Sequence, residues 1–281
     1  MNMKSIFKSL LLVAFLACPV ALNAGDDDSD GFGARFSAEA DYRISRGFHL
    51  SVSEEIRLGG RNIMDRSHTQ LGISYKINDY LKVGGAYTAI AAYKDDVTIL
   101  EDNSTMTRYW YDWRHRVSGY VMGSFKAGQW KFSLRERIQG TYRTRELNNL
   151  QDPQMEWVLR SRLKVAYKCR TVPLEPYAYF EPRLVLNGAK WSEESVTPEF
   201  ENAVFLGHKD VYFNRLRGAV GVEWRLARRH SLDFYCLYDR LRDKEIDARK
   251  EGSEKGETLK AQTFFVTGNR VSVGVGYKFS F

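Results

Sequence analysis

Hydrophobic and polar residues alternate along most of this chain. Residues 270–281 are the clearest case, because every second side chain from Val271 to Phe281 is apolar and those between are polar or glycine. A period of two over this length predicts a β-strand with one apolar face. Ten earlier segments repeat the pattern, at residues 36–44, 48–58, 71–77, 81–93, 109–125, 130–142, 157–167, 177–186, 212–226 and 232–238.

The connections between these segments alternate in length. Residues 78–79, 126–129, 170–175 and 227–231 form short turns, whereas residues 59–67, 95–106, 144–155, 187–210 and 242–267 form long polar stretches. Short turns at one end and long loops at the other are typical of bacterial outer-membrane barrels, whose long loops are extracellular. The pattern predicts an all-β, antiparallel transmembrane β-barrel rather than a soluble β-sandwich.

A rule of parity bears on the number of wall strands. Single-chain bacterial barrels have an even number of strands, and eleven segments alternate. Since the chain is expected to end on the periplasmic side, segment 36–44 would begin on the outer side. We therefore expect ten wall strands, with twelve as the alternative, and the role of residues 36–44 stays open.

The two ends of the chain predict its destination. Lys4 and Lys8 precede an apolar run over residues 10–22 and small residues around Ala24, which predicts a secretory signal peptide at residues 1–24. A lipoprotein signal at Cys18 is the alternative. Residues 25–35 form an acidic leader and residues 36–281 the barrel. The last strand, ending at Phe281, resembles the C-terminal signature of outer-membrane barrels, which implies the outer membrane, its lipid, and recognition by the barrel assembly machinery.

Composition agrees with a barrel and limits its partners. A mean hydropathy of −0.44 excludes a helical membrane protein, but only alternate residues of a barrel face lipid. The net charge of +7 would suit nucleic acid, a partner that an exported chain rarely meets. Cys169 and Cys236 remain after cleavage, and their positions on separate segments favour neither a disulfide nor a metal site.

The inward positions of the middle strands are strongly basic. They are Arg114, Arg116, Arg135, Arg137, Arg160, Arg162, Lys164, Arg215 and Arg217. Guanidinium groups suit carboxylates and phosphates because their donors form a planar fork. One interpretation is a pore lining that attracts small anionic solutes. The other is a salt-bridged interior without conduction, because a barrel of about eight strands has room only for side chains.

Two outward carboxylates and one inward His–Ser pair have possible roles of their own. Glu54 and Glu136 fall on the lipid face, where a carboxylate is costly at mid-depth, so they indicate an interface, a local register change or an oligomer contact. The oligomeric state stays open. His49 and Ser51 share the inward face of one strand, but spacing shows no third partner for catalysis. We therefore expect no enzyme, cofactor or metal site.

Short sequence strings add a resemblance. Residues 215–224 (RLRGAVGVEW), residues 176–181 (PYAYFE) and the final Tyr277-x-Phe279 resemble an uncharacterised family of Gram-negative outer-membrane proteins, known only as a domain of unknown function. The resemblance covers roughly residues 48–281 in layout and implies a barrel without an assigned activity. The inward arginine pairs are also similar to those of oligogalacturonate-specific porins, which pass acidic sugars. That likeness implies anion-facing roles for Arg114, Arg116, Arg135, Arg137, Arg160, Arg162, Arg215 and Arg217.

Overall fold

The structure is a computed structural model of the whole chain, and it describes residues 31–59, 62–99, 105–145, 153–191, 205–251 and 258–281. The predicted signal peptide, residues 1–24, lies outside these ranges. No helix in the described part of the chain is long and apolar enough to cross a membrane. Every regular element there is a β-strand, which confirms the all-β prediction.

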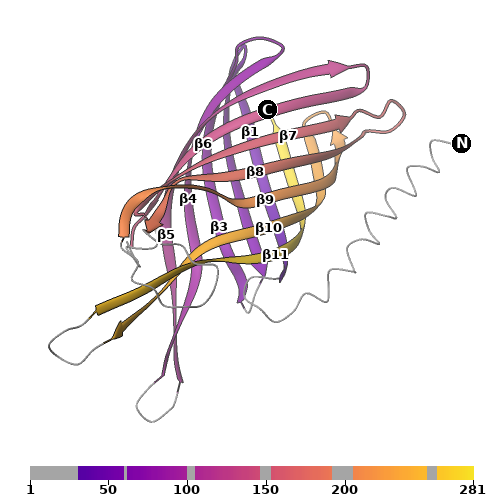
Figure 1. Cartoon of the computed structure of the whole chain (residues 1–281). Coiled ribbons are helices and arrows are strands. Elements are labelled where there is room, and N and C mark those ends of the chain that lie inside the picture. The colour runs from indigo at the N-terminus through magenta and orange to yellow at the C-terminus, as the bar shows by residue number, and fades with distance from the viewer. Residues whose placement is uncertain (1–30, 60–61, 100–104, 146–152, 192–204, 252–257) are drawn as a thin grey trace, which may run out of the picture.

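Eleven strands follow one another and close into a barrel (Figure 1). Each strand from β1 to β10 pairs antiparallel with the next along the chain. The strands are β1 (Gly31–Ser45), β2 (Phe48–Gly59), β3 (Asn62–Lys76), β4 (Leu81–Ile99), β5 (Thr105–Ala127), β6 (Trp130–Arg143), β7 (Met155–Tyr167), β8 (Leu174–Trp191), β9 (Phe205–Ala227), β10 (His230–Glu251) and β11 (Thr258–Ser280).

The first strand closes the barrel in an unexpected way. In β1, Phe36 is paired with Ile56 of β2 on one edge and with Val275 of β11 on the other. The β1–β11 pair is parallel. The wall therefore has eleven strands, rather than the expected ten or twelve. An even number is needed only when every pair is antiparallel, and one parallel pair permits an odd number. Because β1 begins at Gly31, residues 31–35 of the predicted leader belong to the wall.

Four of the predicted long loops are wrong in extent. Every residue that the structure describes within 59–67, 95–106, 187–210 and 242–267 belongs to a strand, and the pairing reaches Ile99 with Thr105 in one hairpin and Glu251 with Thr258 in another. The β4–β5 and β10–β11 hairpins project beyond the wall at the same end of the barrel (Figure 1). Backbone pairing continues there after the alternation of apolar residues has ended, because both faces of a projecting hairpin can be polar.

The alternation assigns opposite environments to the two faces of the wall. Outward side chains such as Phe36, Leu71, Val117 and Phe213 are apolar and about half exposed. Buried polar residues lie on the inward face, among them Asp112, Gln139, Glu181 and Asp239, which are at most 3% exposed. The hydrophobic surface of this fold is therefore outside and its polar groups are inside, as a lipid-facing barrel requires.

The end of the chain is bonded into the seam between β11 and β1. The backbone N–H of Phe281 donates to the Asp41 carbonyl oxygen at 2.9 Å. Its ring lies 4.4 Å from the Phe279 ring and 5.9 Å from the Tyr42 ring, measured between centroids. The terminal aromatic residue thus fastens the last strand to the first.

Deleting Phe281 should weaken this seam. It removes one backbone hydrogen bond and two aromatic contacts, so we expect the free energy of unfolding to fall by about 2 kcal/mol. Phe281→Ala keeps the backbone bond and should lose roughly half as much. Urea unfolding of the refolded barrel in lipid vesicles measures both values. Equal stability of the deletion variant and the wild type would contradict the proposed contribution of the seam contacts.

Candidate functional site in the barrel lumen

All nine basic residues predicted to face the lumen lie on its side of the wall. Strand pairing keeps directly opposed residues on one face, and the registers join these residues to the buried inward positions of β5–β9. The side-chain period of two was enough for this assignment, because a one-residue error would have moved every arginine outward.

Four arginines form one continuous row across adjacent strands. Arg137 of β6 is opposite Arg160 of β7, Arg160 is opposite Arg183 of β8, and Arg183 is opposite Arg215 of β9. Neighbouring strands are less than about 5 Å apart, and like charges placed directly opposite destabilise a sheet. Carboxylates must therefore compensate part of this row.

Glu181 of β8 is the main compensating group. It accepts a hydrogen bond from Arg160 Nε at 3.0 Å and one from Arg162 Nε at 2.5 Å. The Arg135 guanidinium lies 3.9 Å from the same carboxylate. Because Glu181 is only 3% exposed, its charge is screened little by solvent and acts on all three arginines.

Three further carboxylates hold other arginines. Asp239 accepts hydrogen bonds from Arg217 at 2.7 and 2.9 Å and from Arg35 at 3.5 Å. In a similar way, Asp112 pairs with Arg114 and Glu156 pairs with both Arg143 and Arg183. The salt-bridged interpretation of the interior therefore holds for part of the lumen.

Arg116, Arg137 and Arg215 are different, because within the described residues none of them makes an ion pair. Arg116 Nε donates to the Thr141 hydroxyl oxygen at 2.9 Å. The Arg137 guanidinium carbon lies 5.6 Å from the centre of the Tyr120 ring. The Nε groups of Arg137 and Arg215 are buried without an acceptor. Among the described residues, these three arginines therefore contribute positive charge to the lumen without a carboxylate in direct contact.

Lys164 is in contact with an aromatic ring that is itself hydrogen-bonded to a carboxylate. Its Nζ lies 3.7 Å from the centre of the Tyr177 ring, and the Tyr177 hydroxyl donates to both carboxylate oxygens of Asp233 at 2.9 and 3.0 Å. A cation over a ring face is attracted by the ring quadrupole. This cation is therefore stabilised by a ring that is itself anchored to an acid.

Sequence reasoning missed several lumen arginines. Arg183 shares the inward phase of Glu181, and Arg57 shares that of Glu55, so alternation alone could have identified both. Arg66 was missed because residues 59–67 were taken as a loop, whereas it is paired with Arg57 inside β3.

The two outward carboxylates keep their predicted face and have hydroxyl partners. Glu54 accepts hydrogen bonds from Ser67 at 2.5 Å and from Thr69 at 2.6 Å. Glu136 accepts one from Ser161 at 2.5 Å. These local hydrogen bonds reduce the cost of a carboxylate on an apolar face, and the register there is regular.

His49 has a partner that spacing did not reveal. Its Nδ1 lies 2.8 Å from Asp41 Oδ1, across the β1–β2 pair. The Ser51 hydroxyl, on the same inward face, donates to the Gly72 carbonyl oxygen at 3.5 Å. Asp41 has the inward phase of β1, so it became identifiable once residues 36–44 were known to be wall.

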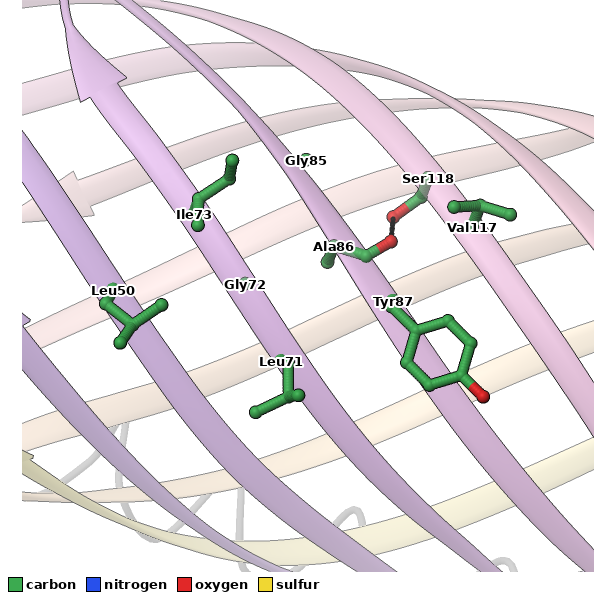
Figure 2. A pocket seen from close by; sticks show the side chains of 9 residues that line it. All are labelled: Leu50, Leu71, Gly72, Ile73, Gly85, Ala86, Tyr87, Val117 and Ser118. Atoms are coloured by element: carbon green, nitrogen blue, oxygen red, sulfur yellow. Dashed lines mark hydrogen bonds between the residues drawn. The ribbon is translucent and has the colours of Figure 1, made fainter.

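An apolar hollow lies on the outer wall over β2–β5 (Figure 2). Leu50, Leu71, Ile73, Tyr87 and Val117 surround it, and each is between 38% and 56% exposed. Gly85 leaves the hollow open, since its outward position has no side chain. The hollow therefore belongs to the outward face and is separate from the charged lumen.

The closed wall, its apolar outer face and its charged interior define a transmembrane-type β-barrel. The family model described as "Protein of unknown function (DUF2490)" matches residues 32–249, and the chain belongs to this family. No curated protein matches the chain in sequence.

Two solved outer-membrane proteins are similar to this chain at low sequence identity. The NanC porin is 14% identical, with 89% of this chain and 98% of the porin covered and a TM-score of 0.44. Outer-membrane expressed OmpT of Vibrio cholerae is 11% identical, with 80% of this chain and 64% of OmpT covered and a TM-score of 0.37.

Proposed function

We propose that this protein is exported to the Gram-negative outer membrane, where its lumen passes small anionic solutes. The observation that carries the proposal is the set of three lumen arginines without an acid partner, Arg116, Arg137 and Arg215. The apolar outer face and the outer hollow support contact with membrane lipid (Figure 2). The bonded terminal strand supports recognition of β11 by the barrel assembly machinery.

The mechanism follows from the electrostatics of a narrow lumen. A wall of low dielectric constant focuses the field of one sign of charge and raises the local concentration of the opposite ion. Rings of arginine and lysine select for anions in pores. Eleven strands enclose more space than the eight that are just filled by side chains. Anions therefore enter more readily than cations.

Electrical recording tests this proposal. The refolded protein is inserted into planar bilayers with a tenfold gradient of potassium chloride, and the reversal potential is measured. We expect discrete channels whose reversal potential has the sign for chloride. Folding of the inserted protein is checked by its heat-modifiable mobility in electrophoresis. Cation preference would contradict the proposal. The absence of conductance from a folded barrel would also contradict it.

A non-conducting binding barrel is the second candidate. It is favoured by the four carboxylates that hold most lumen arginines and by the projecting β4–β5 and β10–β11 hairpins (Figure 1). Trimming β10–β11 beyond the Leu241–Gly268 pair separates the candidates. Lost attachment of whole cells to a surface ligand, with unchanged conductance, would favour the binding role.

A further inference from the structure

Four inward arginines from separate strands act on one another electrostatically. Arg183 of β8 and Arg215 of β9 are directly opposed in adjacent strands. Arg57 of β2 interacts electrostatically with Arg215 and also with Arg116 of β5. Arg116 interacts in turn with Arg183. Because β2, β5 and β8–β9 lie on different sides of the closed wall, these interactions run across the lumen rather than along one strand.

The carboxylates nearby do not balance this arginine cluster of Arg57, Arg116, Arg183 and Arg215. Arg57 Nε donates to Glu55 at 2.6 Å. Glu156 binds Arg183 but also the additional Arg143. Counted together, the four arginines of the cluster and these two glutamates leave two positive charges.

Asp239 does not change the net charge of the arginine cluster. It acts electrostatically on Arg215, but its oxygens already accept hydrogen bonds from Arg217 and Arg35. One carboxylate bonded to two guanidinium groups has no charge left for a third. The positive excess at the cluster therefore persists.

Two donors of the cluster are also unused. The Nε groups of Arg183 and Arg215 are buried and have no hydrogen-bond acceptor. They belong to directly opposed residues of adjoining strands on the inward face. A buried donor without an acceptor is costly. An oxyanion held between the two planar guanidinium groups would satisfy both donors.

We propose that the arginine cluster binds a small anion with a phosphoryl group, which rests on the proposed function and names its solute class. A phosphoryl group carries about −1.5 to −2 charges at pH 7 and three acceptor oxygens. A monocarboxylate has a single charge and two oxygens. The positive excess and the two unused donors match the phosphoryl group better.

Calorimetric titration with pyrophosphate tests the site. The refolded full-length barrel, in phospholipid-free detergent and chloride buffer at pH 7, is titrated at constant ionic strength. We expect saturable binding to one site and binding at least about tenfold weaker in Arg215→Gln, the scale of one charge-assisted hydrogen bond. Arg228→Gln removes the same charge from the exposed β9–β10 turn and should bind like the wild type.

One further variant and two further ligands make the result decisive. Arg215→Lys keeps the charge without the planar fork and should also weaken binding, which provides the measurement if Arg215→Gln does not fold. Acetate should neither bind nor compete. Glycerophosphoethanolamine, a soluble headgroup, distinguishes a lipid source from a free phosphate, because tighter binding than pyrophosphate would identify the lipid headgroup as the source of the phosphoryl group.

The contrary outcomes separate this inference from the proposed function. An anion-selective channel without saturable pyrophosphate binding would overturn the site and leave the pore. Pyrophosphate binding by a barrel without conductance would overturn the pore and leave the site. Equal weakening by Arg228→Gln, or competition by acetate at similar concentration, would overturn the phosphoryl site in favour of general electrostatic attraction.

Discussion

Charge reversal at Arg116, Arg137 and Arg215 should convert the pore from anion-selective to cation-selective. Replacing all three by glutamate changes the lumen charge by six units at the positions that have no acid partner. Because fields in a narrow low-dielectric channel are strong, we expect the reversal potential in a potassium chloride gradient to change sign. Single-channel recording measures this effect directly.

The matched control places the same charge change outside the lumen. Lys126, Arg170 and Arg228 lie exposed at the short-turn end of the barrel, where salt screens charges beyond about 10 Å at 0.1 M. Their replacement by glutamate should leave the sign of the reversal potential unchanged. If the two triple variants behaved alike, selectivity would come from the overall charge of the protein rather than from the lumen arginines.

Removing the charge of Asp239 should cause the largest loss of stability. This carboxylate is 2% exposed and holds Arg217 at 2.7 Å and Arg35 at 3.5 Å. Asp239→Asn leaves two buried guanidinium groups without an anion, which typically costs about 3–5 kcal/mol. Denaturant unfolding in vesicles, followed by tryptophan fluorescence, gives the change in the free energy of unfolding.

Two comparisons show whether that loss comes from an uncompensated charge. Asp79→Asn removes a carboxylate that pairs with Lys76 in an exposed turn, and it should change stability very little. Asp239→Leu combined with Arg217→Met replaces the buried pair by apolar groups and should recover part of the loss. A double variant less stable than Asp239→Asn would show that packing, not charge, dominates at this position.

Alternation along the chain is sufficient to specify the wall and its two faces. Alternation places Val271 outward and Arg217 inward without any tertiary information, because successive side chains of a strand point to opposite faces. Every one of the eleven alternating segments is a strand in the structure. The lumen assignment of the nine predicted basic residues follows from the same period.

The closure of the wall and the pairing of its charges depend on contacts between strands that are distant in the sequence. The parallel pairing of Phe36 with Val275 depends on the stagger of the whole sheet. The sharing of Glu181 by Arg160 and Arg162 depends on the register between β7 and β8. Alternation along one strand specifies the face of a side chain but not its neighbours around the ring. For that physical reason the charge left on Arg116 and Arg215 appeared only in three dimensions.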